Sequence, residues 1–109
     1  MEIQFLYSED CPSHEEALSR LQQVLKEEGI NAEISIGKVE AEEQAMRLRF
    51  AGSPTILIDG HDIVPLANPH YNLTCRAYRL EDGRISPLPS IMMIRRAVRA
   101  AKDMQRQDE

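Results

Sequence analysis

A cysteine and a histidine near the amino terminus are the residues best suited to chemistry in this chain. They open and close the stretch Cys11-Pro12-Ser13-His14, and the only other cysteine, Cys75, lies far along the chain. A thiolate is a nucleophile and a ligand for soft metals, and a neighbouring imidazolium favours the thiolate over the thiol. We therefore take Cys11, His14 and Cys75 as the candidate catalytic residues.

The elements around Cys11 are predicted to activate it. Residues 2–7 have the composition and alternation of a strand, and an amphipathic helix is expected from Pro12 to about residue 28. Cys11 would then lie at about the N-cap, beside unpaired backbone N–H groups and the positive end of the helix dipole, which favours a thiolate. Glu9 and Asp10 work against that negative charge.

The rest of the chain predicts one α/β domain over residues 1–109. Apolar periodicity predicts strands at 32–36, 55–59, 62–64, 74–80 and 84–86, with helices at 39–50 and from Ser90 to about 102 and a frayed tail at 103–109. A strand–helix–strand start should be parallel and the hairpins after it antiparallel. The expected architecture is therefore a central mixed sheet whose second half is antiparallel.

Composition excludes several classes of function. The chain has 109 residues and a formal net charge of −5, which argues against a general nucleic-acid binder. No apolar run approaches the ~20 residues needed to span a bilayer, and no signal peptide is recognised. Two cysteines without an export signal suggest the cytoplasm, where cysteines are more often catalytic or metal-ligating than permanently bridged. The late arginines, such as Arg76 and Arg99, are expected on solvated faces, with an anion site as the alternative.

Two motifs, Cys11-Pro12-Ser13-His14 and Gly52-Ser53-Pro54-Thr55, resemble those of the thioredoxin-like superfamily, which includes the glutaredoxins. The resemblance runs over nearly the whole chain. It implies a mixed sheet of four or more strands flanked by three helices, a redox-active Cys11, and a cis peptide bond between Ser53 and Pro54. It also implies that substrate binds against Pro12, Ser13, Ser53, Pro54 and Thr55, with the Ser53 backbone offering an edge to an extended substrate.

The chain departs from a dithiol member of that superfamily because His14 stands where the second cysteine would be. An oxidoreductase of this kind would need either an external thiol, such as glutathione as co-substrate, or the distant Cys75 to resolve a mixed disulfide. A strand at 74–80 could turn Cys75 into the core, or the added segment 62–64 could bring it within reach of Cys11, and simple topology favours the external thiol. The expected partners are protein or low-molecular-weight disulfides and thiols, without a metal, nucleic acid or membrane.

Two other readings stay open. Cys11, His14 and Cys75 could supply soft nitrogen and sulfur ligands to a metal ion in a metal-handling module. The chain could also keep the fold as an interaction domain without redox turnover. Turnover of a disulfide substrate separates the first reading from both alternatives.

Overall fold

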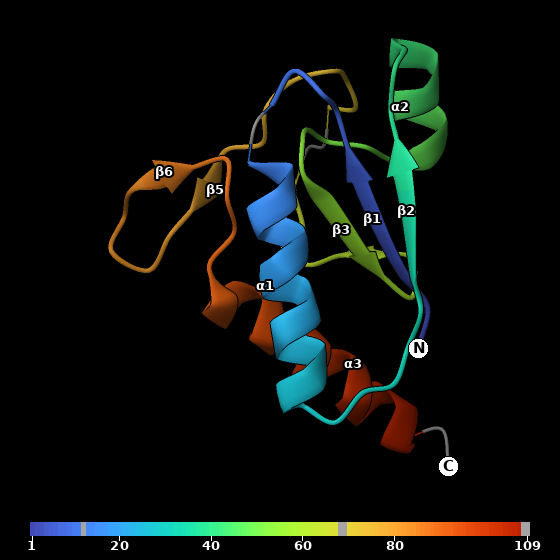
Figure 1. The fold of residues 1–109 in the computed structure, drawn as a ribbon, viewed down its shortest axis with the longest axis vertical. Coiled ribbons are helices and arrows are strands. Elements are labelled where there is room, and N and C mark those ends of the chain that lie inside the picture. Colours follow the sequence, from blue (N-terminus) through green and yellow to red (C-terminus); the bar gives the residue numbers. More distant parts are fainter. Residues whose placement is uncertain (12, 68–69, 108–109) are drawn as a thin grey trace.

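The computed structural model describes residues 1–11, 13–67 and 70–107 of the chain. Three helices surround a four-stranded mixed sheet of order β2-β1-β3-β4, and a two-stranded hairpin of β5 and β6 stands apart from it (Figure 1). In chain order the elements are β1 (Ile3–Tyr7), α1 (His14–Glu27), β2 (Ile34–Lys38), α2 (Glu42–Leu48), β3 (Thr55–Ile58), β4 (His61–Asp62), β5 (Tyr78–Arg79), β6 (Ile85–Ser86) and α3 (Ile91–Gln107).

The sheet is parallel in its first half and antiparallel in its second, as the sequence predicts. β1 pairs with β2 in parallel, with Ile3 opposite Ile34, because α1 carries the chain back across the sheet. β1 also pairs with β3 in the antiparallel sense, with Ile3 opposite Ile58. β3 turns into β4 through Asp59 and Gly60, which have φ of 51° and 82°. Two positive φ values in a two-residue turn match the twist of a hairpin.

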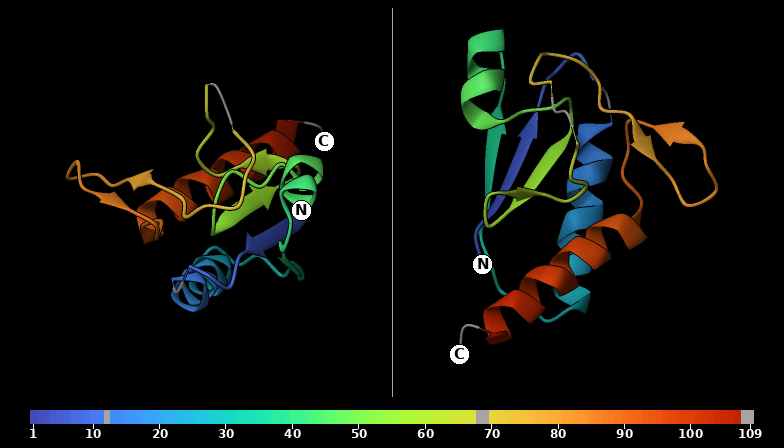
Figure 2. Two further views of the ribbon diagram at one scale, coloured as in Figure 1. Left: turned by 90° about the horizontal axis from the view of Figure 1, so that it is seen from above. Right: turned by 180° about the vertical axis from the view of Figure 1, so that it is seen from behind.

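Alternate residues of β1 and β3 build two apolar layers. One layer joins the sheet to α1 and α3, and the other joins it to α2. Figure 1 shows α3 crossing behind the C-terminal half of α1, and Figure 2 gives the same pair from above and from behind. The first layer contains Ile3, Phe5, Leu21, Val24, Ile56, Ile94 and Val98. The second contains Leu6, Val39, Ala45, Phe50 and Leu57.

Helix ends follow local signals in α1 and α3. Gly29, with φ of 70°, ends α1, and its N–H donates to the Lys26 carbonyl at 3.2 Å. Ser90 caps α3, because its Oγ accepts the Met93 N–H at 3.1 Å. The helix then continues to Gln107, so the predicted frayed tail from residue 103 is wrong as far as the structure describes it.

The predicted bounds of β2 and α2 are also wrong. β2 begins at Ile34 rather than residue 32, and Ile36 is 55% exposed because β2 is the edge of the sheet. α2 spans only Glu42–Leu48, and Arg49 ends it in the left-handed conformation with φ of 59°. Val39 and Phe50 are buried but lie outside the helix. They are apolar because they pack in the core, not because they share one face of a helix.

Candidate functional site

Cys11 and Cys75 form a disulfide across a sequence separation of 64. Their Cα atoms lie 5.9 Å apart, which is within the usual span of such a bridge. Of the two positions that the sequence leaves open for Cys75, the structure shows the one within reach of Cys11. Figure 1 shows the chain between β4 and β5, in yellow and orange, passing the blue turn that leads into α1. The structure thus brings together the two cysteines that the sequence left apart.

Cys11 lies in the turn between β1 and α1. Its N–H donates to the Ser8 carbonyl at 3.2 Å. Ser13 is the N-cap of α1, although its side chain makes no capping hydrogen bond, so the predicted N-cap role of Cys11 is wrong by two positions. Pro12, a predicted substrate-binding residue, lies outside the described residues. Cys11 still precedes the amino end of a 14-residue helix, where the dipole favours negative charge.

The acidic residues near Cys11 oppose a thiolate there less strongly than the sequence suggests. Glu9 pairs with Lys38 of β2 at 2.9 Å, so its charge is largely matched. The hydrogen bond to Glu9 raises the pKa of Lys38, which keeps this ammonium charged. Asp10 is exposed to water, which screens its charge.

His14 holds the backbone of this turn. Its Nδ1 lies 3.1 Å from the Cys11 carbonyl oxygen. Because a carbonyl only accepts, Nδ1 must carry the proton. The His14 ring stacks on Tyr7, with centroids 4.4 Å apart and planes inclined by 18°. These two contacts orient the imidazole against Cys11, while its predicted role in stabilising a thiolate stays a prediction.

The Ser53–Pro54 peptide bond is cis, as the resemblance implies. Ser53 also connects this loop to the cysteine turn, because its Oγ accepts the Ser8 N–H at 2.9 Å. Thr55 bonds back to the Gly52 carbonyl through its hydroxyl. Ser53, Pro54 and Thr55 are all buried, whereas Ser13 is half-buried. Three of the predicted substrate-binding residues therefore lie beneath the surface in this oxidised state.

The backbone edge of Ser53 is occupied by the chain itself. Residues 72–78, which we call the Cys75 segment, place Cys75 in a parallel bridge opposite Ser53. The Ser53 N–H donates to the Thr74 carbonyl at 2.7 Å, and the Arg76 N–H donates to the Ser53 carbonyl at 2.9 Å. The expectation that this edge is open to substrate is therefore wrong for the oxidised protein. Only part of the predicted strand 74–80 is regular, the β5 residues paired with β6.

Gly52 makes the approach of the Cys75 segment possible. Its φ of 125° is one that residues with a side chain rarely adopt. A Cβ on Gly52 would lie 3.0 Å from both the Cα and the N of Arg76. No other residue type fits here without moving the segment.

The buried side chain of Arg76 holds the Cys75 segment in place. This arginine is only 5% exposed, and its guanidinium bonds both carboxylate oxygens of Asp62 at 2.9 Å. It also donates to the Val64 carbonyl at 3.0 Å and lies 4.6 Å from the centroid of the Tyr78 ring. Burial alone would lower the pKa of Arg76, but the hydrogen bond and charge of Asp62 raise it overall, so the guanidinium stays charged.

Tyr78 fixes the other end of the segment. Its hydroxyl donates to the Pro54 carbonyl at 2.6 Å. Burial raises the pKa of Tyr78 well above its ordinary value of 10, so the phenol stays a donor at neutral pH. The sequence reasoning missed Gly52, Asp62 and Tyr78 and expected Arg76 to be solvated. The one available signal was a glycine immediately before Ser53-Pro54, where backbones approach closely.

The two bridged cysteines differ in exposure. Cys11 retains 3% of its surface, whereas Cys75 is exposed, as are the three residues before it. Thr74 and Arg76 make the backbone hydrogen bonds to Ser53. The N–H and C=O of Cys75, which lies between them, therefore point away from Ser53. Among the described residues neither of these two groups has a hydrogen-bond partner. The outer side of Cys75 is thus available to another molecule.

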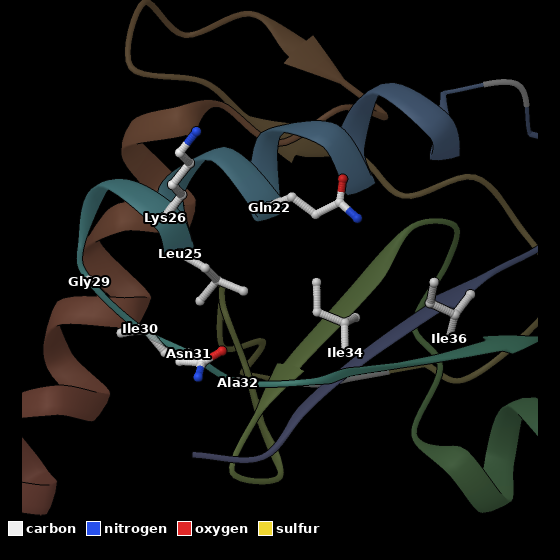
Figure 3. Close-up of a pocket in the computed structure, with 9 residues that line it drawn as sticks. All are labelled: Gln22, Leu25, Lys26, Gly29, Ile30, Asn31, Ala32, Ile34 and Ile36. Carbon is white, nitrogen blue, oxygen red and sulfur yellow. The ribbon is translucent and has the colours of Figure 1, made fainter.

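Other parts of the structure offer less chemistry. Figure 3 shows an open pocket of about 510 Å³ between the end of α1 and β2, lined by apolar residues such as Leu25, Ile30 and Ile34 and containing no predicted site residue. Within the described ranges, no three His, Cys, Asp or Glu side chains are placed to share a metal ion. No helix in the same ranges is long and apolar enough to cross a membrane.

No family model, curated protein or solved structure matches the chain. The arguments about function therefore depend on the geometry of the two cysteines and on the residues that hold them.

Proposed function

We propose that this protein is a thiol–disulfide oxidoreductase of thioredoxin-like fold whose redox pair is Cys11 and Cys75. The observation that carries the proposal is the Cys11–Cys75 bridge, which joins the turn before α1 to the segment bound at Ser53, next to the cis proline. The sheet order β2-β1-β3-β4 with three helices supports the thioredoxin-like assignment.

The chemistry is a two-step exchange. A substrate thiolate attacks one sulfur of the bridge, so that a mixed disulfide forms and the other cysteine leaves as a thiolate. A second substrate thiolate attacks the substrate sulfur of this mixed disulfide and releases the first cysteine. Two thiols become one disulfide, and the protein disulfide becomes two thiols; the reverse sequence reduces a substrate disulfide. Cys75 thus stands as the redox partner of Cys11, in place of the external thiol that the sequence favours.

The proposed substrates are protein or low-molecular-weight thiols and disulfides, with glutathione as a co-substrate. A bridge that cycles also agrees with the cytoplasm expected from the sequence, where permanent disulfides are rare. The position of Cys11 before α1 supports cycling, because the helix dipole favours the thiolate that forms when the bridge opens.

A redox titration tests the proposal. Oxidised protein is equilibrated in buffers of varied reduced-to-oxidised glutathione ratio, its free thiols are alkylated after acid quenching, and the mass shift is measured. We expect a reversible two-electron transition at potentials that glutathione reaches, together with turnover of a small disulfide that Cys11→Ser and Cys75→Ser each abolish. Structural disulfides typically lie below about −300 mV and resist this pool. A bridge that stays closed in the most reducing buffer would show a permanent cross-link instead.

A further inference from the structure

The two bridged cysteines are unequally exposed to an incoming molecule. Cys11 is 3% exposed and lies under the Cys75 segment, whereas Cys75 is exposed and continues an exposed run that begins at residue 72. Thiol–disulfide exchange depends on which sulfur a thiolate can reach. Building on the proposed function, we propose that Cys75 is the cysteine that exchanges with substrate and that Cys11 is its internal partner. This order reverses the one that the sequence suggests.

Bonds other than the bridge also hold the Cys75 segment. On either side of Cys75, Thr74 and Arg76 bond the Ser53 backbone. The Arg76 side chain binds Asp62, and the Tyr78 hydroxyl binds the Pro54 carbonyl. None of these bonds involves sulfur, so they can persist when the bridge opens. Cys75 can then carry a mixed disulfide and still remain within reach of Cys11.

The identity of the leaving group supports the same order. Attack on the Cys75 sulfur breaks the bond to Cys11, and the electron pair leaves with the Cys11 sulfur as a thiolate. A thiol that is more stable as a thiolate leaves faster, and the amino end of α1 provides that stabilisation beside Cys11. Attack on Cys11 would need access to a buried residue and would expel the thiolate of Cys75 instead, which is not part of the turn that leads into α1.

The outer side of Cys75 is also suited to a polypeptide substrate. The Ser53 edge is taken by the Cys75 segment, but the N–H and C=O of Cys75 face outward without partners in the described part of the chain. An extended peptide can add to such an edge through backbone hydrogen bonds. Its own cysteine would then lie close to the exposed side of the bridge.

Trapping the first mixed disulfide tests the assignment on the wild-type protein. Oxidised protein is mixed with excess reduced glutathione and quenched in acid at short times, and the thiol that has been freed is alkylated. Tryptic cleavage after Arg20 and Arg76 puts the two cysteines on separate peptides for mass spectrometry. We expect glutathione on Cys75 and the alkyl group on Cys11. Glutathione on Cys11 with an alkylated Cys75 would overturn the assignment and leave the proposed oxidoreductase intact.

Single-cysteine variants compare the two thiols without the bridge. In Cys11→Ser, the remaining Cys75 should be alkylated at least about tenfold faster than Cys11 in Cys75→Ser, because reactivity follows exposure of the thiolate. Circular dichroism of both variants checks that the fold is kept. Equal rates, or a faster Cys11, would contradict the assignment. A bridge that resists glutathione while Cys75 alkylates faster would refute the proposed function but not the exposure on which the assignment depends.

Discussion

Replacing Arg76 by methionine should loosen the segment that carries Cys75. The substitution removes two charge-assisted hydrogen bonds to Asp62, both 2.9 Å long, and one to the Val64 carbonyl. Each charge-assisted bond contributes about 1.5–3 kcal/mol, and a buried pair that loses one partner destabilises by about 3–5 kcal/mol. The Asp62 side chain retains 16% exposure and can be partly rehydrated. We therefore expect a loss near the lower end, about 3 kcal/mol.

Urea unfolding followed by circular dichroism measures this loss, with the bridge reduced and with it intact. For a chain of this size, about 3 kcal/mol also lowers Tm by more than about 10 °C. Arg79→Met is the matched control, because Arg79 is exposed, and an exposed substitution should change stability by no more than about 0.5 kcal/mol. The reduced Arg76→Met protein should also re-form its bridge more slowly than the control, since Cys75 is less well held.

A double-mutant cycle isolates the ion pair. Asp62→Asn keeps the Oδ1 atom that accepts the Val64 N–H at 2.9 Å but removes the charge. If Arg76 acts through Asp62, the two substitutions together should destabilise less than their sum, with a coupling of about 1–3 kcal/mol. Additive losses, or an Arg76→Met protein as stable as Arg79→Met, would refute the view that this pair anchors the segment.

Three further predictions concern the same framework. Gly52→Ala should destabilise by about 2 kcal/mol more than Gly83→Ala and should slow formation of the disulfide. Both glycines have positive φ, but only Gly52 has backbone within 3.0 Å of the added Cβ. Equal losses in urea unfolding would contradict this steric argument. The hydrogen bond from Arg99 lowers the pKa of Glu28 below 4.5, so its contribution, present at neutral pH, is lost as the pH falls through that lowered value. Glu28→Gln should therefore flatten the acid dependence of stability as the pH falls below about 5 in urea titrations, and an unchanged acid dependence would contradict this. Burial raises the pKa of Tyr78, so stability present below about pH 10 is lost as the pH rises further. Tyr78→Phe should weaken this alkaline loss in urea titrations, and at neutral pH it should remove about 1 kcal/mol with the bond to Pro54.

Local patterns in the sequence were enough to predict the framework of the fold. The alternation around Phe5 and Ile56 predicted the two central strands, which are confirmed as β1 and β3. Asp59-Gly60 predicted the turn between β3 and β4, and Ser90 predicted the cap of α3. The cis bond at Pro54 was implied by the motif around it. In each case, neighbouring residues carry enough information, because a strand face, a turn or a cap depends on a few adjacent positions.

The place of Cys75 was decided only by the tertiary structure. Residues 65–72, between β4 and β5, show no apolar periodicity in the sequence, so no local pattern predicts where the chain after them lies. Its path depends instead on partners distant in sequence: Asp62 for the Arg76 guanidinium, the Ser53 backbone, and the space above Gly52. Ser53 lies just before β3 and Asp62 lies in β4, so these contacts depend on the pairing of β3 with β4. The sequence alone therefore determined which residues carry thiol groups, while long-range packing decided that the two cysteines meet and which of them is exposed.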